Sequence, residues 1–147
     1  MTDIFSVEKR SSVMSRIRST GTAPERLLFS ALQRAVGPEL VILRNVDSLP
    51  GKPDAVLPDL KVAVFADGCF FHSCPEHGRV PRSNTAYWKP KLQRTARRDR
   101  RNGRALRADG YSVWRFWEHD LRPSSSDRVE RVIRGRVERR KRQLGMS

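Results

Sequence analysis

The stretch that decides the fold is Phe65-Ala-Asp-Gly-Cys-Phe-Phe-His-Ser-Cys-Pro-Glu-His77. It holds both cysteines of the chain and two of its three histidines. Its first residues end an apolar run that predicts a strand, and the Asp-Gly pair that follows is typical of a turn into a surface loop. The residue types able to bind metal or move protons are therefore concentrated in one loop at the end of a strand.

The spacing Cys69-x4-Cys74-x2-His77 places three ligands for a metal in this loop. His119, the remaining histidine, could complete a tetrahedral Cys2His2 zinc site from a distance. In a reducing compartment two cysteines so close in sequence favour metal binding over a disulfide. His72 would then be left for catalysis at the surface of the loop. For His119 the alternative is a solvent-facing histidine.

The charge of the chain indicates its partner. Lys and Arg number 30 against 16 Asp and Glu, which gives a formal charge of +14 and an isoelectric point near 11.2. This excess is typical of proteins that neutralise phosphates, and it favours nucleic acid over a membrane. No apolar run approaches the roughly 20 residues that span a bilayer, and the polar start is no secretory signal. We therefore expect a cytoplasmic protein with one domain over residues 1–147.

The first half of the chain predicts two helices followed by strands. Val7, Val13, Met14 and Ile17 suit an amphipathic helix over residues 6–18. Thr22-Ala-Pro-Glu25 is a capping-box pattern with proline in the first turn, and the helix it starts should stop at Gly37-Pro38. Three short strands are expected next, at residues 40–43, 54–57 and 61–65, as neighbours in one sheet.

The second half predicts a long basic helix over residues 85–108, a strand over 111–117 and a last helix over about 127–144. The last helix follows a polar linker at residues 123–126, and its apolar stripe is narrow. Residues 139–142 suggest a disordered basic tail. Together these elements predict an α/β fold.

Two carboxylates stand out among the basic residues. Asp54 follows Pro53 at the start of a strand, and Asp67 ends the next strand, an arrangement in which nucleases hold Mg²⁺ beside a phosphodiester. Pro-Asp is also a common turn dipeptide, and from the dipeptide alone the turn is favoured. Asp99 is the only acid between Lys89 and Arg107, and its alternative is an ordinary ion pair with a helix arginine.

Seven segments, in order and spacing, resemble the very short patch repair (Vsr) endonucleases, a branch of the PD-(D/E)xK superfamily. They are Arg10-Ser-Ser-Val-Met-Ser-Arg-Ile17, Thr22-x-x-Glu25, Leu49-Pro-Gly-Lys-Pro-Asp54, Val64-Phe-Ala-Asp-Gly-Cys-Phe-Phe-His72, Val80-Pro-x-x-Asn-Thr-x-Tyr-Trp88, Arg98-Asp-Arg-Arg101 and Trp114-Arg-Phe-Trp-Glu-His119. The resemblance implies a restriction-endonuclease-like three-layer α/β/α core with a central mixed sheet and a structural zinc site. It implies an enzyme that nicks one DNA strand beside a T:G mismatch formed by deamination of 5-methylcytosine, and so starts short-patch repair.

By this resemblance Asp54 binds Mg²⁺ together with the backbone carbonyl of Ala66, and His72 is the general base toward water. Glu25 and Asp99 would support the site through metal-bound water or by positioning His72. The third position of a capping box is an equally good explanation of Glu25.

The sequence departs from the superfamily at the D/E-x-K element. Asp67-Gly68-Cys69 supplies the acid but no lysine, so His72 is the natural replacement. The expected zinc ligands, Cys69, Cys74, His77 and His119, include two histidines where some relatives use more cysteine.

Aromatic and basic residues complete the DNA contacts that the resemblance implies. Phe70 and Phe71, with Trp88 and Met14, would wedge into the base stack beside the mismatch, where stacking is weak. At least one phenylalanine could instead belong to the core. Contacts with DNA are expected from the long basic helix and from an N-terminal helix within residues 1–20, and residues 124–147 are expected to form a basic C-terminal helix. The residues of the long basic helix are Arg94, Arg97, Arg98 and Arg101.

Two other functions stay open from the sequence. The chain could be a zinc-stabilised DNA-binding module without catalysis, or a Vsr-like nuclease of restriction or phage defence with another DNA substrate. As a mismatch nickase it would bind mismatched double-stranded DNA as a monomer, with mismatch-repair proteins as partners.

Overall fold

The structure is a computed structural model that describes residues 22–69, 71, 74–75 and 80–146. The helix predicted over residues 6–18 and the DNA-contacting segment 1–20 lie outside the described residues, as do Met14, Phe70, His72 and His77. The remaining site predictions all fall within the described part of the chain.

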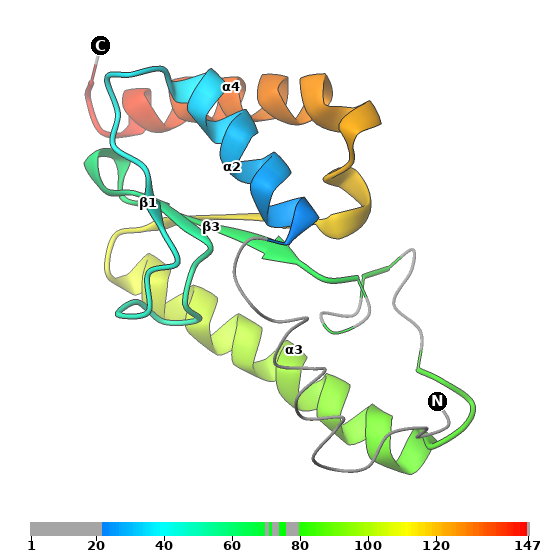
Figure 1. The fold of residues 1–147 in the computed structure, drawn as a ribbon. Helices are drawn as coiled ribbons and strands as arrows, with labels where there is room; N and C mark the ends of the chain where they lie inside the picture. The colour runs from blue at the N-terminus through cyan, green and yellow to red at the C-terminus, as the bar shows by residue number, and fades with distance from the viewer. Residues whose placement is uncertain (1–21, 70, 72–73, 76–79, 147) are drawn as a thin grey trace.

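A four-stranded mixed sheet forms the centre of the protein (Figure 1). The strands are β1 (Leu43–Arg44), β2 (Ala55–Leu57), β3 (Val62–Asp67) and β4 (Ser112–Trp117), in that spatial order. The first three are antiparallel neighbours, and β4 runs parallel to β3. The prediction of adjacent strands is confirmed, but the first strand is shorter than expected because only two residues pair with β2 at the sheet edge.

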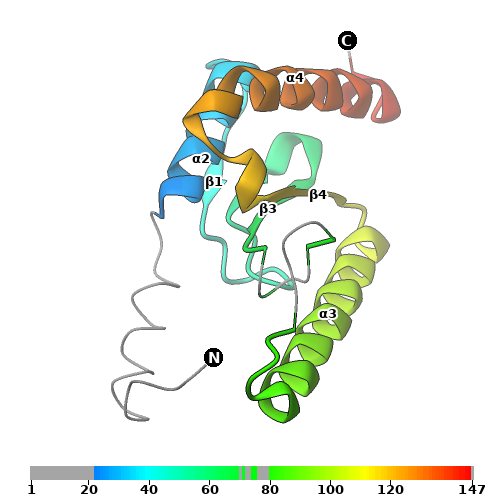
Figure 2. The ribbon, with the colours of Figure 1, turned by 90° about the vertical axis from the view of Figure 1, so that its right-hand side faces the viewer.

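Among the described residues, three helices cover the two faces of the sheet: α2 (Ala23–Val36), α3 (Thr85–Ala108) and α4 (Ser126–Gln143). In Figures 1 and 2, α2 and α4 lie on one face and α3 lies on the other. Three short 3-10 helices, η1 (Pro58–Leu60), η2 (Glu118–Asp120) and η3 (Pro123–Ser125), join the larger elements. The α/β prediction is confirmed.

Side chains along β3 point alternately to the two faces of the sheet, so this strand contributes to the hydrophobic core on each face. Val62 and Val64 pack with α2 and α4, whereas Ala63 and Phe65 pack with Leu106 of α3. Because both faces are covered, the strand reads as an almost continuous apolar run. The polar residue that ends it, Asp67, is therefore carried to the α3 side of the sheet.

Local signals set the ends of α2 as predicted. The Thr22 hydroxyl accepts the N–H of Glu25, which is the first half of a capping box. The helix stops at Gly37, whose φ of 71° lies in the left-handed region that glycine adopts without strain.

The predicted disordered tail at residues 139–142 is wrong, because α4 continues through it to Gln143. Val129, Ile133 and Val137 are buried along its inner face. Arg140 donates hydrogen bonds from Nε to the carbonyl of Leu60, at 2.7 Å, and from its terminal nitrogen to the carbonyl of Gly110, at 2.7 Å. Tertiary contacts therefore order a segment whose composition alone resembles a solvated tail.

None of the helices in the described ranges has both the length and the apolar character needed to cross a membrane.

Candidate active site and metal cluster

Three segments bring the candidate site residues to one edge of the sheet. Because β2 is antiparallel to β3, its start lies beside the end of β3, with Ala55 opposite Val64. Because β4 is parallel to β3, Trp117 lies opposite Asp67. Asp54, Asp67 and the loop that carries the cysteines therefore share this edge.

Asp54 and Ala66 are joined across β2 and β3. The backbone N–H of Ala66 donates to Oδ2 of Asp54 at 2.7 Å, and both residues are half-buried. The bond holds the carboxylate of Asp54 against the backbone of Ala66, the residue that the family resemblance implies as its partner in binding Mg²⁺. A carboxylate held beside backbone groups at a strand end offers the oxygen ligands that Mg²⁺ prefers.

A second cluster consists of Cys69, Cys74 and His119, whose ligand atoms all lie within 4.8 Å of one another. The Nδ1 atom of His119 is 3.2 Å from the sulfur of Cys69 and 3.6 Å from that of Cys74. Tetrahedral zinc bonds of about 2.3 Å to sulfur and 2.0 Å to nitrogen imply a sulfur to nitrogen separation of roughly 3.6 Å. Two thiols and an imidazole at this spacing fit zinc chemically.

Neighbouring carboxylates hold this cluster in place. Glu118 accepts the backbone N–H of Cys69 at 3.1 Å, and the N–H of Cys74 donates to the carbonyl of Cys69 at 2.9 Å. The other ring nitrogen of His119, Nε2, lies 3.6 Å from Oδ2 of Asp120. A carboxylate behind a ligating histidine fixes its tautomer and ring orientation. The short helix η2 therefore holds the backbone of Cys69 through Glu118 and carries His119, the third residue of the cluster.

Burial raises the pKa of the Cys69 thiol, a hydrogen bond from the backbone of His119 lowers this pKa, and Cys74 raises it further. Thiolate is the form that binds metal. A metal ion at this cluster would therefore displace a proton that the buried site otherwise retains.

Asp67 is committed to Arg115 of β4. One guanidinium nitrogen of Arg115 lies 3.1 Å and 3.0 Å from the two carboxylate oxygens, and Asp67 is 4% exposed. The centre of the Arg115 guanidinium lies 4.2 Å from the centroid of the Phe65 ring. The acid that opens the incomplete D/E-x-K element is thus ion-paired with an arginine from the neighbouring strand.

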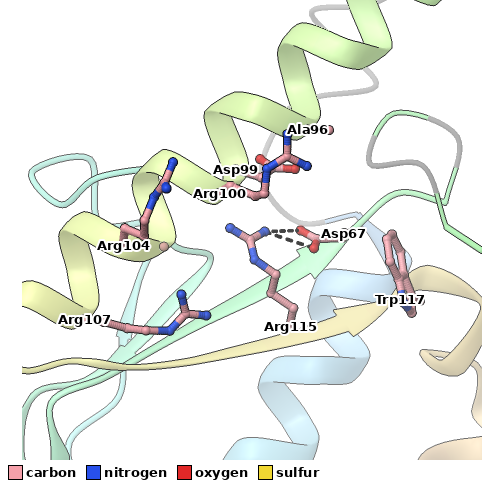
Figure 3. A pocket seen from close by; sticks show the side chains of 9 residues that line it. Asp67, Ala96, Asp99, Arg100, Arg104, Arg107, Arg115 and Trp117 are labelled. Atoms are coloured by element: carbon pink, nitrogen blue, oxygen red, sulfur yellow. Dashed lines mark hydrogen bonds and ion pairs between the residues drawn. The ribbon is translucent and has the colours of Figure 1, made fainter.

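A cavity of about 420 Å³ opens between this ion pair and α3. Figure 3 shows Arg115 directed toward Asp67 on one side, with the arginines and Asp99 of α3 on the other. The residues that line the cavity are Asp67, Ala96, Asp99, Arg100, Gly103, Arg104, Arg107, Arg115 and Trp117. Four guanidinium groups against two carboxylates leave the cavity net positive, which suits an anionic ligand.

The other predicted residues have distinct locations. Asp99 is half-buried at the cavity, and Glu25 lies in the first turn of α2. Trp88 is 4% exposed, whereas its neighbour Tyr87 is 48% exposed. Phe71 is half-buried. The four arginines predicted to contact DNA are all exposed on α3, and none of them lines the cavity: Arg94, Arg97, Arg98 and Arg101.

Sequence reasoning missed Arg100 and Arg107 among the inner arginines of the cavity. Arg100, Arg104 and Arg107 follow one another at three- and four-residue spacing, which places them along one side of a helix. Gly103 lies among them, and a side chain there would come within 3.3 Å of the Arg107 guanidinium. In the sequence, a glycine among regularly spaced arginines was the pattern that could have indicated this cavity. No sequence pattern indicated the role of Arg115, because its ion pair with Asp67 depends on how β3 and β4 pair in the sheet.

Comparisons with known proteins find DNA-nicking or mismatch endonucleases. Residues 2–76 match the family model described as DNA mismatch endonuclease Vsr. The Type II nicking enzyme V.NaeI of Lentzea aerocolonigenes is 46% identical over 114 residues, which are 76% of this chain and 68% of that protein. The Type II nicking enzyme V.NmeAIP of Neisseria meningitidis is 38% identical over 138 residues, 91% and 96% of the two chains. The DNA mismatch endonuclease Vsr of Escherichia coli is 34% identical over 125 residues, 83% and 77%.

Proposed function

The chain belongs to the Vsr family of DNA mismatch endonucleases and is a DNA endonuclease, and we propose that it nicks one strand beside a T:G mismatch. The observation that carries the proposal is the Asp54 to Ala66 hydrogen bond of 2.7 Å at the edge that also bears the Cys/His cluster. Family membership argues against a DNA-binding module without catalysis. We propose the T:G mismatch as the substrate because of the resemblance and because the family is described as DNA mismatch endonucleases.

Asp54 and the backbone of Ala66 would hold Mg²⁺ at the scissile phosphate. The ion supplies Lewis-acid stabilisation of the charge that develops on phosphorus. His72, outside the described residues, would accept a proton from the attacking water, for which its unperturbed pKa of about 6.5 is suitable. Asp99 and Glu25 would position these groups. Asp67 would act through Arg115, which it holds at the rim of the cavity.

Zinc would be structural in this proposal. Cys69, Cys74, His119 and His77 would give four protein ligands, which leaves no position for water. The cluster would fix the loop that carries His72 and the phenylalanines next to the metal at Asp54. We further propose a restriction-endonuclease-like core, with residues 1–147 as one domain.

The basic surface would bind the DNA backbone. The cavity arginines lie beside the sheet edge, and the exposed arginines extend the positive charge along α3. Phosphate contacts fix the register of the enzyme on the duplex but carry no sequence information. We place selectivity instead in Met14, Phe70, Phe71 and Trp88, which would enter the stack at the mispair.

In the cell we propose a cytoplasmic monomer that starts very short patch repair together with mismatch-repair proteins. A second candidate is a nuclease of restriction or phage defence that cuts a different DNA. The observation that favours it is that relatives at 46% and 38% identity are called Type II nicking enzymes.

A strand-specific nicking assay tests the proposal. Duplexes of one sequence would contain T:G, T:A or C:G at one position, with each strand labelled in turn and with Mg²⁺ or chelator present. We expect a nick in the T-containing strand of the T:G duplex only, and only with Mg²⁺. Equal cleavage of all three duplexes would favour the second candidate, and no cleavage of the T:G duplex with Mg²⁺ would refute the mismatch proposal.

A further inference from the structure

A second cavity lies toward the opposite end of the strands from the candidate active site, and Arg115 of β4 is the residue that lines both cavities. It forms between the C-terminal half of α4 and the start of β4, and its volume is about 320 Å³. Ser112 pairs with Val62 at the start of β3, whereas Asp67 ends that strand. The residues that line this α4–β4 cavity are Ser112, Val113, Trp114, Arg115, Arg136, Arg139, Arg140 and Gln143.

The α4–β4 cavity contains positive charge without a matching acid. Its lining includes three arginines of α4 and no Asp or Glu. In the described part of the chain, neither Arg136 nor Arg139 forms an ion pair with a carboxylate. Burial lowers the pKa of Arg136, and the charge of Arg139 lowers it further. The folded protein therefore carries an electrostatic cost at this cavity that an anion would relieve.

Packing fixes two of the three guanidinium groups. Arg136 lies over the aromatic rings of β4, with its guanidinium carbon 4.9 Å from the centroid of Phe116 and 6.0 Å from that of Trp114. Arg140 is held by the carbonyls of Leu60 and Gly110, each at 2.7 Å. Carbonyl oxygens satisfy its donors but do not neutralise its charge. Side chains that are already ordered lose little entropy when a ligand binds.

The open edge of β4 supplies further donors. The N–H of Ser112 donates to the carbonyl of Lys61 at 2.8 Å. Because alternate residues of a parallel strand bond to the same neighbour, the backbone N–H groups of Val113 and Arg115 face the other way. In the described residues β4 ends the sheet on that side. Backbone N–H groups beside guanidinium forks are the donors that phosphate-binding sites use.

We propose that the α4–β4 cavity is a phosphate-binding site separate from the nicking centre. The ligand is a phosphate group, either free phosphate or a backbone phosphate of a second DNA segment that reaches the far end of the molecule. A cavity of this size holds one such group with its hydration. The competing explanation is that the arginines only protect an edge strand from pairing with other chains.

Thermal unfolding of the full chain in sodium phosphate tests this site against chloride of equal ionic strength. At phosphate about five times its Kd, a single site raises the midpoint by about 2 to 4 °C. We expect the Arg136→Gln, Arg139→Gln double variant to lose this gain. The control double variant, Arg131→Gln with Arg142→Gln, removes two exposed arginines of the same helix outside the cavity and should keep it. If Arg136→Gln impairs folding, the exposed Arg139 can be tested alone as Arg139→Gln.

The source of the phosphate is separated by repeating the titration with bound DNA. If free phosphate is the ligand, it still stabilises the complex with a long duplex, and the cavity variant keeps its affinity for that duplex. If a second DNA segment is the ligand, the long duplex abolishes the phosphate effect, and the cavity variant loses about tenfold affinity for long but not short duplexes. An equal phosphate effect in the cavity and control variants would overturn the proposal.

Discussion

Asp54 Oδ2 lies 2.7 Å from the backbone nitrogen of Ala66, so a carboxylate immediately before β2 is hydrogen-bonded to the backbone near the end of β3. The bond explains why two residues twelve positions apart form one unit at the sheet edge. The carboxylate of Asp67 forms an ion pair with Arg115. We propose Asp54, which accepts the Ala66 N–H through one carboxylate oxygen, as the ligand of a catalytic cation.

The first prediction is that Asp54→Ala abolishes nicking while DNA affinity changes less than about threefold, because phosphate contacts come from arginines rather than from this acid. His72→Ala should behave in the same way. Nicking is measured with Mg²⁺ in excess, and binding by anisotropy with chelator.

Asp54→Asn provides the matched control for the hydrogen bond, since its amide oxygen can still accept the Ala66 N–H. It should fold like the wild type and yet remain inactive. Full activity in any of these three variants would mean that the catalytic centre lies elsewhere.

The second prediction is that the purified chain binds one zinc, which Cys74→Ala and His119→Ala both lose. Loss of a structural zinc removes several kcal/mol of folding free energy, so we expect the unfolding midpoint to fall by about 10 °C or more. Metal analysis and thermal unfolding measure the two effects.

Asp120→Asn is a graded test of the same cluster, because Asp120 lies behind His119 without being a ligand. Loss of such a partner should weaken zinc about 10-fold in competition with a chelator. Arg128→Gln removes only the exposed cation 3.5 Å from Asp120 and should leave zinc affinity unchanged. Zinc-free wild-type protein with normal stability would contradict the structural role.

The third prediction concerns the ion pairs between α2 and α4. The hydrogen bond from Arg34, at 2.6 Å, lowers the pKa of Glu130, burial opposes this shift, and Arg134 adds to the lowering. A carboxylate with a lowered pKa stabilises the fold above its unfolded pKa and loses that contribution as pH falls through the folded pKa. Glu130→Gln should therefore be less stable than the wild type at pH 7, and the difference should vanish at an acidic pH below the lowered pKa of Glu130 in the folded protein. Unfolding midpoints at both pH values measure it, and a constant difference would refute the ionic origin.

Local signals predicted most of the helices and strands, and long-range contacts explain the exceptions. The helix over residues 85–108 was predicted to the residue, because Gly110 marks its end in the sequence. The helix over about 127–144 was predicted closely, but the disordered tail suggested at residues 139–142 was wrong, because Arg140 is ordered by carbonyls of Leu60 and Gly110, which are distant in sequence. Composition cannot reveal such partners.

The same distinction holds at the candidate site. Cys69 and Cys74 were predicted from their spacing, and the structure brings both to His119. Asp54 was singled out from its place at a strand start. The Asp67 to Arg115 ion pair could not be predicted, because it depends on the parallel register that sets Phe65 opposite Arg115.

The fourth prediction is that affinity for duplex DNA falls steeply with salt. With about six phosphates contacted, the slope of log K against log salt should be near −5. Arg104→Gln, at the cavity, and Arg98→Gln, on the exposed side of α3, should each reduce the slope by about 1 if they touch phosphate. Arg131→Gln on α4 is the control. A slope near zero would show that the charge serves another purpose.

The last prediction separates a mismatch nickase from a general nuclease through its aromatic residues. Inserting side chains between base pairs costs a few kcal/mol of unstacking, and the cost is lower at a mispair. The double change Phe70→Ala, Phe71→Ala should therefore reduce nicking of T:G duplex far more than residual nicking of matched duplex, at fixed salt and flanking sequence. Equal losses on both duplexes would mean that these residues belong to the core or contact any DNA.

Trp88 needs a separate comparison because it is buried, while Tyr87 is exposed and packs edge-on against it, with ring centroids 5.0 Å apart. Truncating a buried tryptophan costs about 3 to 5 kcal/mol, so Trp88→Ala must be assayed at a temperature where it is folded. If Trp88 enters the stack, Trp88→Ala lowers the preference for T:G over matched duplex, and Tyr87→Ala does not. If instead Tyr87→Ala lowers that preference and folded Trp88→Ala keeps it, the exposed ring contacts the mismatch and Trp88 only supports it. Because both variants remove one ring from the start of α3, unequal effects on T:G selectivity identify which ring reads the mispair.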